Sequence, residues 1–87
     1  MNNTFFISTS IPYVNAEPHI GFLLEALEAD VIARWHRKLG NHVFFLSGTD
    51  DNALKNVQSA EKTGIETQKF VDLNAEKFIE LLKKFNI

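Results

Sequence analysis

Two short strand patterns on either side of one long helical pattern constrain the fold of this chain most. Thr4–Ser10 and His42–Ser47 are rich in aromatic and β-branched residues, which is typical of buried strands. Between them, from about Ile20 to Leu39, apolar residues recur every four positions, as in an amphipathic helix. A helix of about twenty residues between two strands favours a parallel βαβ unit.

The long helical pattern has a bulky apolar stripe with small residues beside it. The stripe is Leu23, Leu27, Val31, Trp35 and Leu39, and the small residues are Ala26, Ala29 and Ala33. An alanine flank lets a helix approach a sheet closely, whereas Glu25 and most charged residues fall on the other side. Asp30 and Arg34 are spaced for an ion pair, and Gly40 is a good helix stop.

Two more helices are predicted after the second strand, at Ala53–Thr63 and Thr67–Phe85, the first ended by Gly64. The apolar stripe of the last helix is Val71, Ala75, Phe78, Leu82 and Phe85. The fold class is therefore α/β, a partial Rossmann-like parallel sheet in the order strand, helix, strand, helix, helix. Because two parallel strands need neighbours, we expect residues 1–87 to be the N-terminal segment of a doubly wound catalytic domain, truncated before its third strand.

Composition excludes several classes of protein. The chain has 87 residues, a net charge of −2 and no basic block, which argues against a stand-alone nucleic-acid-binding module. It has no cysteine, so it can form neither disulfides nor thiolate metal sites, and we expect no metal ligands. Met1–Thr4 lacks the basic region of a signal peptide, and no apolar stretch approaches the ~20 residues that cross a bilayer. We expect a cytoplasmic protein.

Polar and glycine residues follow both predicted strands. Because ligands bind at the carboxyl ends of parallel strands, Ser8–Gly21 and Gly48–Asn52 are expected to face one ligand. His19 and Gly21 precede or open a helix, where phosphate is stabilised and a missing Cβ allows close approach. The ordinary interpretation is that His19 is a solvated loop residue, Gly21 serves packing, and Asp50 and Asp51 cap the next helix. An acidic side chain there could instead hold a substrate ammonium group.

Taken together, these residues resemble those of one enzyme family. The segment Ile11–Phe22 resembles the His-Ile-Gly-His region of class I aminoacyl-tRNA synthetases, and its Pro-Tyr-x-Asn start is similar to the methionyl enzymes. The resemblance extends through Ala29–Arg37, Val43–Asp50 and Ala60–Ile65 to Ile87. Its signature residues here are Pro12, Tyr13, Asn15, His19, Ile20, Gly21 and Phe22.

The resemblance implies a Rossmann catalytic domain of a methionine-tRNA ligase. Such an enzyme uses ATP, with Mg²⁺, to form methionyl-adenylate, and then transfers methionine to tRNA(Met) for protein biosynthesis. By position, His19 is the catalytic residue, and His19, Gly21 and Phe22 belong to the ATP site. Ile11 and Tyr13 line the methionine pocket, and Asp51 pairs with the methionine ammonium group.

The chain also departs from the family pattern. Phe22 replaces the second signature histidine, Asp51 stands where many relatives have Glu, and Asn52-Ala53 replaces His-Gly. The Lys-Met-Ser-Lys-Ser loop, the insertion that often carries zinc and the anticodon-binding domain are absent from these residues, so zinc is expected only downstream. We expect the chain alone to be inactive in aminoacylation.

Two other functions compete with the ligase. One is a non-catalytic or vestigial module that binds a nucleotide or an amino acid, which Phe22 and the short chain favour. The other is a small nucleotidyltransferase, a class that normally keeps the second histidine and leaves Pro12-Tyr13 unexplained.

Overall fold

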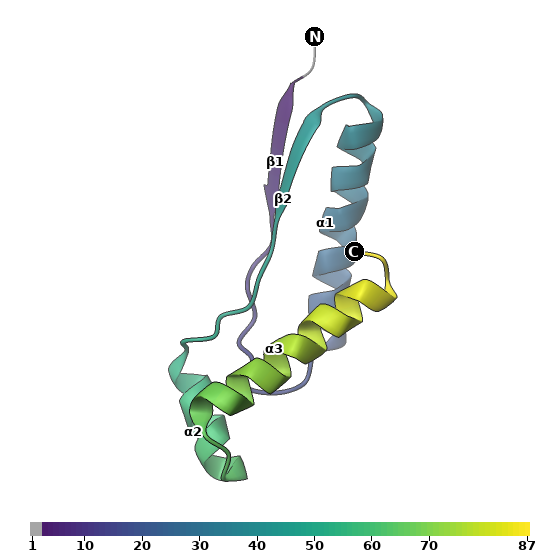
Figure 1. Ribbon diagram of the computed structural model, residues 1–87. Coiled ribbons are helices and arrows are strands. Elements are labelled where there is room, and N and C mark those ends of the chain that lie inside the picture. The colour runs from purple at the N-terminus through teal and green to yellow at the C-terminus, as the bar shows by residue number, and fades with distance from the viewer. Residues whose placement is uncertain (1–2) are drawn as a thin grey trace.

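The computed structural model describes residues 3–87 and contains two strands and three helices. In chain order these are β1 (Thr4–Ser8), α1 (Ile20–Lys38), β2 (His42–Leu46), α2 (Leu54–Thr63) and α3 (Thr67–Lys84) (Figure 1). The predicted α/β class and element order are confirmed, with every predicted element end within two residues of the observed one. The signal-peptide prediction starts at Met1 and Asn2, outside the described residues.

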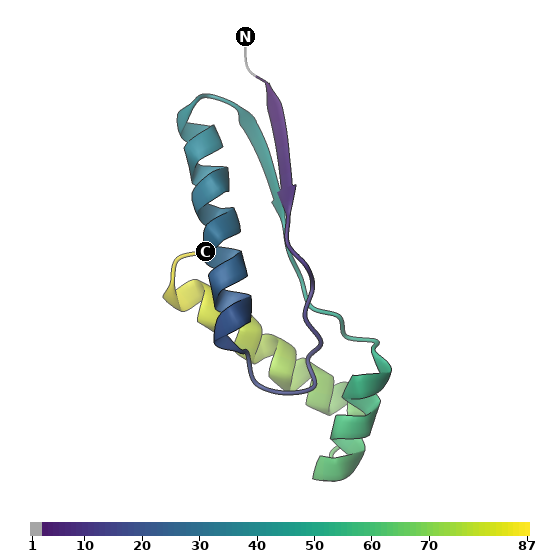
Figure 2. The ribbon, with the colours of Figure 1, turned by 180° about the vertical axis from the view of Figure 1, so that it is seen from behind.

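β1 and β2 pair in parallel, with Thr4 opposite His42 and Ser8 opposite Leu46. α1 covers one face of this sheet (Figures 1 and 2). The other face is bare in the described part of the chain: Phe6, Phe44 and Leu46 are 61%, 62% and 60% exposed. The prediction of buried strands is therefore wrong for this face, and on the face toward α1 the strand side chains are only half-buried, because one helix can cover only one side of a sheet.

The alanine flank of α1, rather than its bulky stripe, is its buried side. Ala26, Ala29 and Ala33 are buried, whereas Val31 and Trp35 are both 58% exposed. Small side chains bring the helix backbone close enough for the His36 ring to stack on Phe5 of β1, with ring centroids 3.6 Å apart. The predicted Asp30–Arg34 ion pair forms, with Arg34 Nε 2.8 Å from Asp30 Oδ2.

Both predicted glycine stops are confirmed, but the predicted aspartate caps are wrong. Gly40 and Gly64 have φ angles of 88° and 74°, the left-handed conformation that glycine adopts at helix ends. The N-cap of α2 is Ala53, which makes no side-chain capping bond. Asp50 and Asp51 stand too far before the helix to serve as its cap; the Asp50 carboxylate instead accepts a bond from the Asn52 amide, 3.3 Å away.

A second apolar cluster lies beyond the strand ends, where α2 and α3 meet the loops. Val14 from the first loop packs in it with Ala60, Phe70, Val71 and Phe78, and Phe22 and Ala75 pack against this cluster. The predicted stripe of α3 is thus confirmed at Val71, Ala75 and Phe78. Its last member, Phe85, is 50% exposed, and Leu54 at the start of α2 is 69% exposed.

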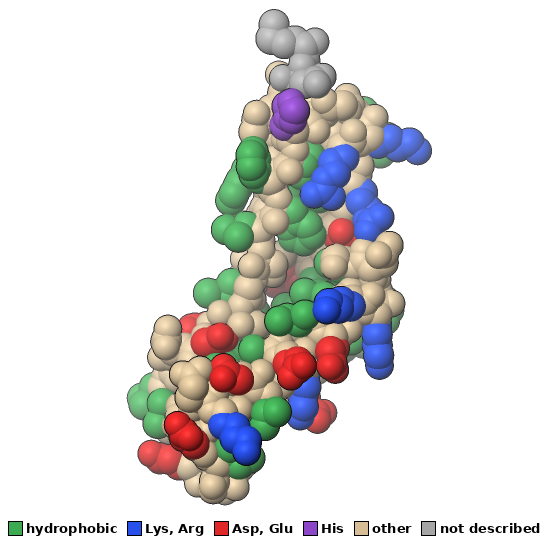
Figure 3. Space-filling model, in the orientation of Figure 1, with side chains coloured by type: hydrophobic (Ala, Val, Ile, Leu, Met, Phe, Trp, Pro, Cys, Tyr) green, Lys and Arg blue, Asp and Glu red, His purple; other side chains and the backbone are tan. Residues whose placement is uncertain are grey.

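The molecule is elongated, with extents of 54 × 21 × 17 Å and a radius of gyration of 15.4 Å. A compact domain of this length has a radius of gyration of about 12 Å. The sheet and α1 lie toward one end and α2 lies at the other, and α3 runs from α2 to the side of α1 (Figure 2). Apolar side chains project beside the strands (Figure 3). Among the described residues, no helix is both long and apolar enough to cross a bilayer.

Candidate active site at the strand ends

The loops that follow β1 and β2 run together, as predicted. Thr9 Oγ1 lies 2.6 Å from Ser47 Oγ at the strand ends. Farther along, Tyr13 and Asp50 form an isolated parallel bridge, and the Asp50 amide donates to the Pro12 carbonyl oxygen at 2.8 Å. The parallel pairing therefore resumes beyond the strands and brings the two predicted site segments into contact.

His19 is the N-cap of α1. Its Nδ1 accepts a hydrogen bond from the Gly21 amide at 2.9 Å, and its carbonyl oxygen accepts one from the Phe22 amide at 3.0 Å. A neutral imidazole that accepts through Nδ1 carries its proton on Nε2. The exposed His19 ring thus stabilises the helix through Nδ1 and offers a hydrogen-bond donor at Nε2. The interpretation of His19 as a solvated loop residue did not predict this capping bond.

Gly21 leaves room for this capping ring. A Cβ atom at position 21 would lie 3.1 Å from His19 Nδ1, closer than ordinary van der Waals contact. Gly21 is exposed, as is Ile20, the first residue of α1, at 75%. The missing side chain at Gly21 therefore serves the orientation of His19 as well as access to the helix N-terminus.

Phe22 packs away from this polar end. Its ring meets Phe78 of α3 edge to face, with ring centroids 4.9 Å apart and planes at 72°. Both rings line a cavity of about 240 Å³ together with residues that follow β2 and others on α3: Ser47, Gly48, Thr49, Ile79 and Leu82. In this structure Phe22 links α1 to the apolar cluster.

The residues predicted to bind methionine lie on the joined loops. Ile11 and Tyr13 are 53% and 45% exposed, and Asp51 is exposed at the start of the turn after β2. Asp51 Oδ1 accepts a hydrogen bond from the Thr49 hydroxyl at 2.6 Å. Pro12 and Asn15, the other signature residues of the loop, are half-buried.

Sequence reasoning missed two residues that contact this loop. Lys55 Nζ lies 5.4 Å from the centre of the Tyr13 ring. Glu25 accepts hydrogen bonds from the Ser10 amide at 2.7 Å and from the Ser10 hydroxyl at 2.9 and 2.8 Å. The hydrogen bond from the Ser10 backbone amide, and to a lesser extent those from the Ser10 hydroxyl, lower the pKa of the Glu25 carboxyl. Helical periodicity placed Glu25 on a polar face but gave no sign of this partner.

Two buried asparagines, Asn56 and Asn74, were also missed, although both had a visible signal. Asn74 falls inside the apolar stripe of α3, three residues after Val71 and four before Phe78. A polar residue on a buried helix face normally has a hydrogen-bond partner there. Asn56 in α2 had the same spacing signal, three residues after Ala53 and four before Ala60, but its apolar neighbours there are only alanines.

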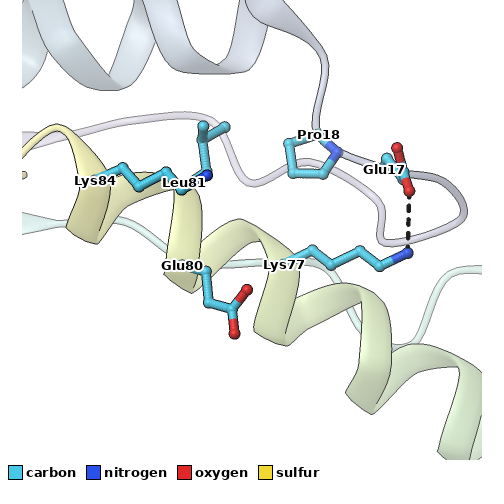
Figure 4. Close-up of a pocket in the computed structure, with 6 residues that line it drawn as sticks. All are labelled: Glu17, Pro18, Lys77, Glu80, Leu81 and Lys84. Atoms are coloured by element: carbon cyan, nitrogen blue, oxygen red, sulfur yellow. Dashed lines mark hydrogen bonds and ion pairs between the residues drawn. The ribbon is translucent and has the colours of Figure 1, made fainter.

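A separate hollow lies between α3 and the loop that precedes His19 (Figure 4). It is lined by Glu17, Pro18, Lys77, Glu80, Leu81 and Lys84. Lys77 Nζ pairs with Glu17 Oε1 at 3.2 Å, and the lining carries two acidic and two basic side chains. It contains no predicted site residue. Within residues 3–87, no group of three or more potential ligand side chains could hold a metal ion.

Comparisons with known proteins agree over nearly the whole chain. The family described as tRNA synthetases class I (M) matches residues 5–87. A methionine–tRNA ligase of Thermotoga maritima is 48% identical over 83 residues, and one of Rickettsia conorii is 44% identical over 87. A structure of Mycobacterium tuberculosis methionyl-tRNA synthetase in complex with methionyl-adenylate superposes on 98% of the chain with a TM-score of 0.95 and 35% identity.

The chain spans a small part of these proteins: 13% of the Thermotoga relative, and 17% of both the Rickettsia relative and the Mycobacterium structure. The family match covers all five elements except Thr4, the first residue of β1. The structural match confirms that the elements are arranged as in methionyl-tRNA synthetases. The chain therefore belongs to the family described as tRNA synthetases class I (M).

Proposed function

We propose that this chain is the N-terminal segment of the catalytic domain of a methionine–tRNA ligase. The observation that carries the proposal is the superposition, over 98% of the chain, on a synthetase solved with methionyl-adenylate. The reaction would join the methionine carboxylate to the α-phosphate of ATP, releasing pyrophosphate, and would then transfer methionine from the adenylate to the 3′ end of tRNA(Met), releasing AMP. ATP would enter as its Mg²⁺ complex, and the enzyme would work in the cytoplasm.

His19 is the catalytic residue in this proposal, and its geometry suits phosphate. With Nδ1 held by the Gly21 amide, the Nε2–H group is the donor directed to a phosphate oxygen. A donor whose bond strengthens as charge moves onto the leaving pyrophosphate lowers the barrier. Gly21 lets ATP approach the helix N-terminus. Phe22 has no polar atom, so its part in the ATP site is limited to apolar contact beside the first turn.

Methionine would bind across the joined loops. Ile11 and Tyr13 offer exposed apolar surface for the thioether chain, and the Asp51 carboxylate offers a partner for the ammonium group. The Thr49 hydroxyl, 2.6 Å from Asp51 Oδ1, restricts the orientation of that carboxylate. The bare sheet face and the exposed stripe of α1 support the proposal, because further strands and helices of a larger domain would cover them.

A chimera tests the proposed function. This chain replaces the matching 83 residues of the Thermotoga maritima ligase, and ATP–pyrophosphate exchange is measured with methionine. We expect exchange from the chimera and none from the isolated 87-residue chain, which lacks the lysine-rich signature loop. Exchange by the isolated chain would contradict the proposed dependence on downstream parts. Methionine binding by the chimera without exchange would favour the alternative, a non-catalytic binding module.

Within the chimera, His19→Ala should lower the rate of adenylate formation about tenfold or more, equivalent to about 1.4 kcal/mol of transition-state stabilisation. It should weaken methionine binding much less, because His19 is assigned to phosphate. Single-turnover adenylate formation and equilibrium methionine binding separate the two effects. Equal losses in both would mean that His19 only caps α1.

A further inference from the structure

Two buried asparagines each bond to the backbone of a loop at the strand ends. Asn74 of α3 is 6% exposed, and its Nδ2 donates to the Val14 carbonyl oxygen at 2.8 Å. Asn56 of α2 is fully buried, and its Nδ2 donates to the Asp50 carbonyl oxygen at 2.8 Å. One asparagine thus anchors the loop after β1, and the other anchors the loop after β2.

Each anchored carbonyl adjoins a residue assigned to methionine. Val14 directly follows Tyr13, and Asp50 directly precedes Asp51. Tyr13 and Asp50 are themselves paired in the isolated bridge. Two loops that are joined to each other and anchored at adjacent positions have little freedom to change their separation. The asparagines therefore act on the distance between the proposed pocket wall and the proposed ammonium partner.

The anchor at Asn56 carries an energetic cost. Its Oδ1 is buried and has no hydrogen-bond partner among the described residues. Flipping the amide would place an oxygen against the Asp50 carbonyl oxygen, so the observed orientation is the one that makes a bond. An unsatisfied buried oxygen destabilises the fold, whereas a leucine of similar size would leave no such atom. The gain at this position is the restraint on the loop.

We infer that Asn56 and Asn74 are positioning residues for methionine, fixing the separation of Tyr13 and Asp51 through the loop backbone. Neither side chain is assigned a contact with substrate. The inference rests on the proposed function, because it takes Tyr13 and Asp51 as the methionine contacts. It adds two residues from helices that the sequence pattern assigned to structure alone.

The test uses the active chimera with Asn56→Leu and Asn74→Leu. Each substitution removes the hydrogen-bond donor and replaces the amide with an apolar side chain of similar size. We expect the KM for methionine to rise about tenfold in each variant, while the KM for ATP changes less than twofold. A purely structural loss would reduce the amount of active enzyme, and hence the apparent kcat, and leave both KM values unchanged.

Asn41→Leu is the matched control. Asn41 Nδ2 lies 3.2 Å from His36 Nδ1, so the control also removes one amide contact. It lies just before β2, at the opposite end of the sheet from the two loops. Its methionine KM should equal that of the parent chimera. If Asn74→Leu lowers the yield of folded enzyme, Asn56→Leu decides the question, because it also removes an unsatisfied oxygen.

If the parent chimera is active and both variants, Asn56→Leu and Asn74→Leu, keep the parental methionine KM, the inference is wrong. The proposed function would still stand in that case. A rise in methionine KM of the same size in Asn41→Leu would also overturn the inference, because the effect would then be general. An inactive parent chimera would contradict the proposed function and, with it, the inference.

Discussion

At the scale of single residues, Gly21 shows how one missing side chain can serve two purposes. It gives access to the N-terminus of α1, and it leaves space for the ring of His19, whose Nδ1 would lie 3.1 Å from an added Cβ. Because the His19 ring is exposed, it can move aside without disturbing the core. Its movement would break the capping bond to the Gly21 amide, so a side chain at position 21 should change activity more than stability.

We predict that Gly21→Ala in the chimera changes the stability of α1 by no more than about 1 kcal/mol, because the gain in helix propensity is opposed by the loss of the His19 capping bond. The rate of adenylate formation should fall about tenfold, a loss of about 1.4 kcal/mol in transition-state stabilisation, because the added Cβ displaces the His19 ring from its capping position. Amide exchange of α1 and single-turnover kinetics measure the two quantities. An unchanged rate would show that the orientation of His19 does not depend on Gly21.

Phe22, unlike the exposed Gly21, is a signature-position residue whose aromatic side chain packs toward the core. The edge-to-face contact with Phe78 explains why a side chain without a hydrogen-bond donor suits this fold. Such pairs contribute about 0.5–1.5 kcal/mol beyond the area they bury.

We predict that Phe22→His destabilises the contact of α1 with α3 by about 1–2 kcal/mol and brings no faster adenylate formation. Protection of α3 amides from exchange measures the first effect, and ATP–pyrophosphate exchange measures the second. Phe22→Leu, which stays apolar but loses the ring, should show a smaller loss of protection. Faster exchange in Phe22→His would mean that the missing donor is a real deficit.

At the scale of elements, Glu25 ties α1 to the loop after β1 through three hydrogen bonds from Ser10. These bonds lower the pKa of Glu25 in the folded state. The stabilisation is therefore present above the ordinary carboxyl pKa of 4.5 and is lost as the pH falls through the lowered value. The connection between helix and loop should weaken in acid.

We predict that an NMR titration finds the pKa of the Glu25 carboxyl below its ordinary value of 4.5. Ser10→Ala should return that pKa only part of the way to its ordinary value. The hydrogen bond from the backbone amide of residue 10, which is the larger cause of the lowered pKa, remains. A Glu25 pKa at or above 4.5, or complete recovery in Ser10→Ala, would contradict the bonding seen here.

At the scale of the whole molecule, the described chain leaves large apolar surfaces uncovered. One is the outer face of the sheet, and the other is the exposed stripe of α1 around Val31 and Trp35. Exposed apolar patches promote association. The sequence contains a single tryptophan, so Trp35 reports directly on whether this stripe is covered.

We predict that Trp35 of the isolated chain emits as a water-exposed indole at low concentration and is readily quenched by acrylamide. Its emission should shift to the blue as the concentration rises and copies associate through the apolar faces. Val31→Gln, which makes the stripe more polar, should move that shift to higher concentration. A blue emission that is independent of concentration would mean that the stripe is already covered within one chain.

How much of the site the sequence predicted depends on the range of the interactions. The sequence predicts that the His19–Gly21 segment binds phosphate, because helix ends have local signatures. The capping bond between these residues is equally local, but it requires a side-chain conformation that residue types do not specify. The bonds from Asn56 and Asn74 depend on how separate helices meet the loops, and the positions of both residues among apolar helix residues indicated burial but not their partners.

The sequence by itself determined the order and ends of the helices and strands, because turn residues and apolar periodicity act within a few positions. It also determined the meeting of the two strand ends, since parallel strands place them at one edge. Tertiary structure alone decided which side of α1 faces the sheet, that Phe22 packs on Phe78, and that Asp50 does not cap α2. Each of these follows from contacts between distant segments or from exact spacing in three dimensions, where close packing outweighs local preference.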